Sequence, residues 1–309
     1  MHKRNIRRLL KLGMLAMSCG LLCTTASAAD IFRAQGEMTG EVSATSAIVQ
    51  TRLTSVNRNV DGDVPGTAGV VRFEYADNEQ FERSQLTPWD SARPESDYIV
   101  KAVLRDLKPS TRYYYRVLYG VDRENTQTGS TCSLCTLQGS TGTDPVSFVV
   151  VTGMNYSAFH GAKRPEKGPR PDRAAGYPAL KTMIEMDLDF FVGTGDNVYY
   201  DGRVFRATTQ PDLRRKWHEQ LVQSRYVELY RNVPTYWEKD DHDHRYNDCD
   251  RAGDREPSSD LGIATFREQV PVVDPTDPEA KTYRTYRVNR DLQIWFVEGQ
   301  DYRSPNRMA

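Results

Sequence analysis

Residues 239–248, KDDHDHRYND, gather side chains that bind metal ions or carry protons. They follow an apolar stretch, 233–237, which predicts a buried strand. Carboxylates that crowd together at the end of a strand repel one another, and a bound cation removes that repulsion. Aspartate oxygens beside a histidine nitrogen suit such a cation. The segment predicts either a metal-binding catalytic loop or a solvated acidic turn.

Three other predicted strands end in polar clusters of the same kind. The nearly continuous apolar run 147–153 predicts a strand covered on both faces. Further strands are predicted at 189–193 and 293–297, and helices at 177–186 and 211–231. The polar residues at the strand ends are Gly153-Met154-Asn155, Gly195-Asp196-Asn197, Asp240-Asp241-His242 and Asp301-Tyr302-Arg303.

Alternating strands and helices predict an α/β fold with a largely parallel sheet. In such folds the carboxyl ends of the strands line the ligand crevice. The four polar clusters are therefore expected to converge there, forming a site with hard oxygen ligands and a nitrogen donor.

The chain before this region has a different pattern. Residues 36–140 hold short β-branched and aromatic runs, separated by turn residues, which predict a β-sandwich. Strands are expected at 47–53, 70–75, 98–104 and 113–119. The turn at 107–113, LKPSTRY, resembles that of fibronectin type III-like domains.

The first 28 residues have the parts of an export signal: a basic start, an apolar stretch at 12–22 and a small-residue cleavage site ending at Ala28. That stretch is shorter than the roughly 20 residues of a membrane anchor. Arg7 and Arg8 are compatible with the Tat route, but the residues around them fit that signal loosely, so Sec export stays open. We expect a periplasmic or extracellular protein without a transmembrane anchor after cleavage. The formal charge of −1, without a basic stripe, argues against nucleic-acid binding.

The remaining cysteines and histidines carry weaker signals. Cys132 and Cys135 have redox or zinc half-site spacing without a second half, so a local disulfide or two buried thiols is expected. His160 is interpreted as a solvated loop residue near the site or a substrate contact. His218 is expected on the surface of the helix 211–231.

Two motifs together resemble a known family. Residues 195–199, GDNVY, followed by 240–243, DDHD, resemble signatures of calcineurin-like metallophosphoesterases. The DDHD form, the preceding sandwich and the export signal narrow the resemblance to PhoD-like alkaline phosphatases/phosphodiesterases. The segment 301–303, DYR, resembles a later strand end of that family.

The resemblance implies a dinuclear site with two metal ions, Fe³⁺ and Ca²⁺. Asp196 would bridge them, Tyr199 would bind the iron through its phenolate, and Asp241 would be a further ligand. His242 would contact or protonate the phosphoester, which a metal-bound hydroxide attacks. Gly153 stands where the family usually has a ligand Cys, so Asn155 is the candidate for the first metal. Arg303 is a candidate phosphate contact, with a surface ion pair as the alternative.

The resemblance also implies the domain organisation: a signal peptide at 1–28, a fibronectin type III-like sandwich at 29–140 and a metallophosphoesterase-like catalytic domain at 141–309. The family's final ligand motifs are not found by residue 309, so we expect an incomplete catalytic domain and a chain that is inactive by itself. The implied partner is a phosphoester, either a small molecule or a polymer.

Two other functions remain open. The acidic loops would suit an exported, non-catalytic calcium-binding or adhesion module. A zinc hydrolase using His242 and His244 is the second alternative. Two histidines at i and i+2 do not share a helix face, but a strand or loop would present both.

Overall fold

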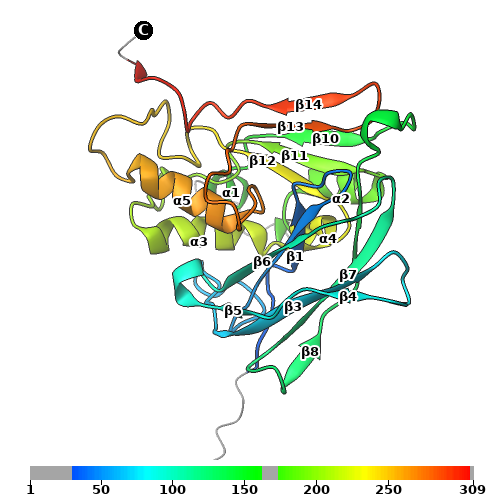
Figure 1. Cartoon of the computed structure of the whole chain (residues 1–309). Coiled ribbons are helices and arrows are strands. Elements are labelled where there is room, and N and C mark those ends of the chain that lie inside the picture. Colours follow the sequence, from blue (N-terminus) through cyan, green and yellow to red (C-terminus); the bar gives the residue numbers. More distant parts are fainter. Residues whose placement is uncertain (1–29, 162–172, 307–309) are drawn as a thin grey trace, which may run out of the picture.

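The computed structural model describes residues 30–161 and 173–306 (Figure 1). The expected signal at 1–28 lies outside the described residues. The strands are β1 (Glu37–Gly40), β2 (Ala47–Arg52), β3 (Gly69–Ala76), β4 (Gln85–Leu86), β5 (Asp90–Ala92), β6 (Ile99–Leu104), β7 (Arg112–Gly120), β8 (Thr126–Thr128), β9 (Cys132–Cys135), β10 (Phe148–Val151), β11 (Phe190–Thr194), β12 (Thr235–Glu238), β13 (Arg284–Arg287) and β14 (Gln293–Phe296). The helices are α1 (Tyr156–Phe159), α2 (Pro178–Glu185), α3 (Gln210–Leu221), α4 (Ser224–Tyr230) and α5 (Ser259–Gln269), with short 3₁₀ turns at Pro94–Ser96 and Gly139–Thr141.

The N-terminal part is built from antiparallel strands, and the four strands expected there are confirmed as β2, β3, β6 and β7. β3 and β7 form the centre of one sheet, with β4, β5, β8 and β9 beside them. β1, β2 and β6 pair in a second sheet. Alternating side chains of both sheets share one apolar core, which includes Val49, Leu104, Phe73, Tyr115 and Val117.

The second sheet continues into the C-terminal part of the chain. β1 pairs with β12 in parallel through one register pair, Gly40 with Thr235. The Thr235 hydroxyl also donates to the carbonyl of Thr39 at 2.8 Å. The strand order is therefore β10-β11-β12-β1-β2-β6. The domain boundary expected near residue 140 stays a prediction. The hydrogen bonds between β1 and β12 join the segments before and after it.

β10, β11 and β12 are parallel, as the α/β pattern predicts. Successive side chains of a strand face opposite sides of a sheet. Phe191 accordingly packs with the apolar residues of α2, α3, α4 and α5. Phe190 packs on the other side, in the core that includes Phe296 of β14. In Figure 1 the helices lie below these strands and β13–β14 above them.

The structure corrects three expectations about the elements. Residues 211–231 form two helices, because Gln223 is extended (φ −63°, ψ 128°) and its side-chain amide donates to the carbonyl of Gln220 at 2.9 Å. β14 pairs antiparallel with β13 in a separate two-stranded sheet. β10 is an edge strand, and Val150 is 59% exposed, so this apolar run is not covered on both faces.

α5 was not expected from the sequence, although Ser258 is a good N-cap residue and its side chain accepts from the Leu261 amide. Over 30–161 and 173–306, no helix combines the length and apolar character that crossing a bilayer requires.

Candidate metal-binding site

The turns after β11 and β12 lie beside each other because their strands are adjacent and parallel, with Gly193 opposite Trp237. Gly195 (φ 101°) and Asp196 (φ 53°) have left-handed backbone conformations. A Cβ on Gly195 would lie 2.5 Å from the amide nitrogen of Asp240. Glycine at 195 thus permits the unusual φ and the close approach of the two turns.

This approach brings together Asp196, Asp241 and His242. One ligand atom from each lies within 4.8 Å of the others, and all three side chains are half-buried. Oδ1 of Asp196 is buried without a hydrogen-bond partner in the described structure. Burial, with the nearby carboxylates of Asp241 and Asp240, raises the pKa of Asp196. An unpartnered buried carboxylate oxygen beside a second carboxylate fits a metal ion, and the His242 ring lies next to these two groups.

Tyr199 contacts both sides of this cluster. Its hydroxyl donates to Oδ2 of Asp196 at 2.8 Å, and its ring lies over that of His242 with centroids 4.2 Å apart. Burial raises the pKa of Tyr199, and the hydrogen bond to Asp196 adds to the rise. Without a cation the phenol therefore keeps its proton.

His242 has a carboxylate partner that sequence reasoning missed. Its Nδ1 lies 2.7 Å from Oδ1 of Asp201. Burial lowers the pKa of His242, but the hydrogen bond and the charge of Asp201 outweigh burial and raise it overall. Oδ2 of Asp201 also accepts from the Asn247 amide at 2.9 Å. Asp201 therefore orients His242 through Nδ1, and among the described residues Nε2 has no hydrogen-bond partner.

Asp243 holds the two turns together. This fully buried carboxylate accepts from the amides of Asp240, Asp196 and Asn197, and from the Asn197 side chain at 2.7 Å. Burial raises the pKa of Asp243 to about 7, against the lowering effect of these hydrogen bonds.

The rest of the loop is organised by two buried side chains. Arg245 donates to the carbonyls of Pro257, Asp250, Ala252 and Arg255. Nε2 of His244 lies 2.9 Å from the Ser259 hydroxyl, and burial lowers the pKa of His244 to about 4. His244 thus points into the α5 interface and does not join His242, so the zinc-hydrolase alternative is wrong.

A cavity of about 370 Å³ opens beside the cluster, and Tyr199, Asp201 and His242 line it. Asn155 lines it as well, and its side-chain oxygen accepts from the Ala158 amide at 2.9 Å as the N-cap of α1. Arg303 is not among its lining residues: it donates to the carbonyl of Cys249 at 3.5 Å and to Asn306.

The other singled-out residues lie outside the cluster. Gly153 has a φ of 73°, and a Cβ there would meet no atom within 4 Å. His160 hydrogen-bonds Gln223 at 3.1 Å. Cys132 and Cys135 are free thiols on β9.

The expectation for His218 was wrong. His218 is buried, and its ring nitrogens each lie 2.6 Å from a carboxylate oxygen, one of Asp63 and one of Asp97. Before the fourth predicted polar cluster, the side-chain amide of Gln300 donates to Asp240 in the turn after β12 at 2.8 Å, and Asp240 lies outside the cluster of Asp196, Asp241 and His242.

Residues 21–135 match the family described as PhoD-like phosphatase, N-terminal domain. No curated protein matches the chain. Among solved structures, one entitled "Structure of PhoD" superimposes with a TM-score of 0.67 at 18% identity, over 88% of this chain and 53% of that one. A purple acid phosphatase, PPD1, from yellow lupin (Lupinus luteus) seeds gives a TM-score of 0.53 at 14% identity, over 84% of this chain and 43% of that one.

The chain thus spans about half the length of these two structures, and at such identities the likeness establishes the fold. The expected α/β class is confirmed. The resemblance to PhoD-like phosphatases is confirmed as well: residues 21–135 match the model of that family's N-terminal domain, and over 88% of its length the chain is similar in fold to the structure entitled "Structure of PhoD".

Proposed function

We propose that this chain forms a metal-dependent phosphoester hydrolase site at the carboxyl ends of β11 and β12. The observation that carries the proposal is the unpartnered buried oxygen of Asp196, which lies within the cluster of Asp241 and His242. A buried carboxylate without a partner is costly unless a cation or a proton neutralises it. The PhoD-like N-terminal domain and the PhoD fold support phosphoester chemistry at this position.

Asp196, Asp241 and Tyr199 are the proposed metal ligands, with Asn155 for a first metal. Fe³⁺ and Ca²⁺ are the proposed pair. When bound, the ions supply the positive charge that offsets the charge of the phosphoryl group. As a ligand, Tyr199 would exchange its hydrogen bond to Asp196 for the metal ion. The cavity lined by Asn155, Tyr199 and His242 is the proposed phosphoester site.

His242 is the proposed proton donor to the leaving group. Asp201 holds its Nδ1 proton and raises its pKa, so the ring keeps a second proton on Nε2 at higher pH than an isolated histidine does. Arg303 stays a candidate phosphate contact, which requires its guanidinium to leave the carbonyl of Cys249. The substrate class, a phosphomonoester or a phosphodiester, is part of the proposal. Export of the protein is part of it as well.

The test combines metal binding with turnover on the full chain. Mono- and diester nitrophenyl phosphates are assayed with added Fe³⁺, Ca²⁺ or both, for the parent chain, Asp196→Asn and His242→Ala. Asp260→Asn is the control, since that side chain is 92% exposed outside the cluster. We expect Asp196→Asn to lose metal, and His242→Ala to keep metal and lose about 10²-fold or more in rate.

The outcomes separate the alternatives. Unchanged rates in both variants contradict the assignment. Calcium binding without hydrolysis in the parent chain supports the non-catalytic calcium module. Metal binding without hydrolysis, restored when further family-type ligands are supplied on a longer chain, supports the inactive-fragment alternative.

A further inference from the structure

The cavity beside the metal cluster is lined by an arginine that has no partner. Arg203 lines it together with Tyr199, Val204 and His242. Arg203 is exposed, and among the residues that the structure describes it takes part in no hydrogen bond, ion pair or ring contact. A guanidinium carries five N–H donors and a permanent positive charge. Those of Arg203 are therefore available to a ligand.

Other arginines around the site are already engaged. Arg206, three residues further along the same segment, donates to the carbonyl of Glu256 at 3.0 Å. Arg251 donates to the carbonyl of Asp301 at 2.7 Å. Both side chains thereby hold main-chain segments in place. Arg203 has no such structural task in the described part of the chain.

The carboxylates near Arg203 are also engaged. Asp201 is the one acidic residue in the lining of the cavity, and its two oxygens contact Nδ1 of His242 and the Asn247 amide. Asp196 and Asp241 are the proposed metal ligands, so bound ions would offset their charge. The charge of Arg203 is therefore not cancelled by a carboxylate of the cavity wall.

The segment that carries Arg203 is attached to the protein on both sides. Two residues before it, Asp201 is bonded to His242. Two residues after it, the ring of Phe205 lies 4.9 Å from Nζ of Lys216 on α3. These contacts keep the main chain of Arg203 at the wall of the cavity that His242 also lines.

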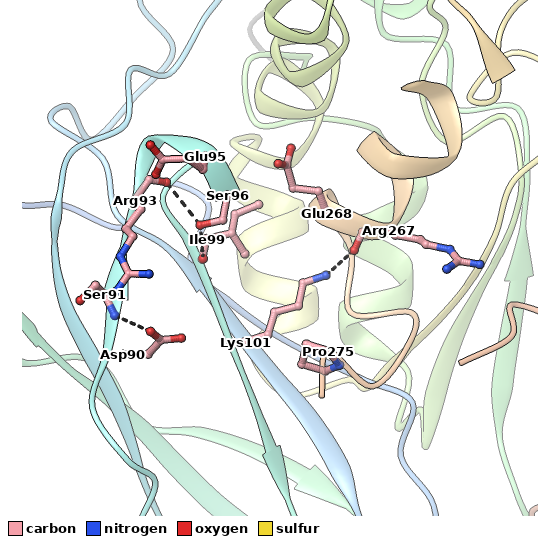
Figure 2. Close-up of a pocket in the computed structure, with 10 residues that line it drawn as sticks. All are labelled: Asp90, Ser91, Arg93, Glu95, Ser96, Ile99, Lys101, Arg267, Glu268 and Pro275. Carbon is pink, nitrogen blue, oxygen red and sulfur yellow. Dashed lines mark hydrogen bonds between the residues drawn. The ribbon is translucent and has the colours of Figure 1, made fainter. Parts of the chain in front are cut away.

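A charged side chain in a cavity can serve the fold instead of a ligand, as a larger cavity of about 720 Å³ near the end of α5 shows (Figure 2). There Nζ of Lys101 lies 2.6 Å from the carbonyl oxygens of both Arg267 and Val270. A lysine that binds the last carbonyls of a helix stabilises the end of that helix. Arg203 lacks contacts of this kind.

We propose that Arg203 binds a second anionic group of the substrate, on the leaving-group side of the phosphoester. The proposal rests on the proposed function, in which His242 protonates the leaving group. Because Arg203 and His242 line one cavity, a group leaving beside His242 meets Arg203 as well. The planar guanidinium binds a carboxylate or a phosphate through two parallel N–H groups.

This contact defines a class of substrate. The cavity of about 370 Å³ lies at the small end of ligand sites, so a compact leaving group fits. The preferred substrates are small phosphoesters whose leaving group carries a carboxylate or a further phosphate close to the ester.

The experiment measures binding, so it does not depend on turnover. The full chain is loaded with Fe³⁺ and Ca²⁺ and desalted, and methylphosphonate, phosphonoacetate and methylenediphosphonate are titrated by calorimetry. The first ligand has one anionic group, and the other two add a carboxylate or a phosphonate. Metal content is measured after each titration, because the last two ligands also chelate free ions. We expect at least one of them to bind about tenfold more tightly than methylphosphonate.

Three variants test the role of the guanidinium. Arg203→Gln should remove the preference and leave methylphosphonate binding unchanged. Arg203→Lys should restore part of it, because lysine keeps the charge and loses the planar fork. Arg123→Gln is the matched control, since Arg123 is exposed on the turn between β7 and β8 and does not line the cavity.

A second measurement uses the parent chain alone. Phenylglyoxal modifies accessible guanidinium groups, and mass spectrometry quantifies the modified peptides. The ligand that binds preferentially should slow modification of Arg203 and leave that of Arg123 unchanged. Equal modification of Arg203 with and without that ligand would contradict the contact.

The outcomes distinguish this proposal from the one on which it rests. Methylphosphonate binding without a preference for either doubly anionic ligand overturns this proposal alone. Weaker binding of all three ligands to Arg203→Gln, by the same factor, also overturns it, because Arg203 would then contact the phosphoryl group itself. If none of the ligands binds the metal-loaded chain, the phosphoesterase assignment fails together with it.

Discussion

Nδ1 of His242 lies 2.7 Å from Oδ1 of Asp201, although 41 residues separate them in the chain. The contact places a carboxylate behind the imidazole, on the side away from Nε2. It determines which nitrogen carries the fixed proton and raises the pKa of the ring. His242 is thereby oriented by a residue outside the loop that carries it.

Asp201→Asn should lower the pKa of His242, because the amide removes the charge that favours the imidazolium. NMR titration of the His242 ring measures this shift without relying on turnover. If the chain hydrolyses phosphoesters, kcat should fall with KM little changed. Asp248→Asn is the control, since this residue lies on the same loop without contacting the ring. An unchanged His242 titration in Asp201→Asn would contradict the pairing.

Gly195→Ala should destabilise the chain and weaken metal binding. Alanine at φ 101° is strained, and its Cβ would lie 2.5 Å from the Asp240 amide, so a cost of about 2–4 kcal/mol is expected. Gly253→Ala is a matched control, with a φ of 83° and no atom within 4 Å of the added Cβ. Urea unfolding measures both. Equal costs would show that backbone strain alone matters and that the close approach of the turns does not.

The buried hydrogen bonds and ion pair of Asp97 should make the free energy of unfolding depend on pH in the acid range. Burial would raise the pKa of Asp97, but hydrogen bonds and charges from His218 and Arg52 outweigh burial and lower it well below its ordinary value. The folded-state pKa is depressed, so this stabilisation is fully present above about pH 4 and is lost as pH falls further. Urea unfolding from about pH 7 to pH 2 measures the loss.

Asp97→Asn should cost about 3–5 kcal/mol at pH 7, because it leaves the buried guanidinium of Arg52 without its carboxylate partner. It should also flatten the acid dependence of the unfolding free energy. Asp291→Asn is the control. The Asp291 side chain is 68% exposed, so its ion pair with Arg290 is worth at most about 1 kcal/mol. A variant that loses stability equally at every pH would show that Asp97 acts through packing and not through its charge.

Arg245→Met should unfold the loop that follows the metal cluster. The fully buried guanidinium donates to the carbonyls of Pro257, Asp250 and Ala252 and so ties this segment together, and a methionine offers no donor to replace it. We expect a loss of about 3 kcal/mol or more and faster hydrogen exchange across 246–257. Arg255→Met is the comparison, because Arg255 lies over the ring of Tyr246 and is exposed. Slow exchange retained in Arg245→Met would contradict this role.

Periodic elements were the most predictable part of the fold. The strand at 189–193 and the helix at 177–186 were predicted to within a few residues, because apolar periodicity and flanking turn residues are local signals. The break in the helix at Gln223 was not predicted. The Gln223 side chain donates to the backbone carbonyl of Gln220 only after tertiary packing has buried it. The exposure of β10 was not predicted either. An apolar sequence shows that a strand could be buried, but it does not show which elements pack against it.

By itself the sequence determined the chemistry available to this protein: GDNVY and DDHD at the ends of two apolar strands. Parallel strands end at the same edge of a sheet, so Asp196, Asp241 and His242 were expected together. Tertiary structure alone decided the partners. Asp201 behind His242, Asp243 joining the two turns and the turning of His244 towards α5 all depend on contacts between segments far apart in the chain. Such contacts arise from packing, which no local pattern of residues encodes.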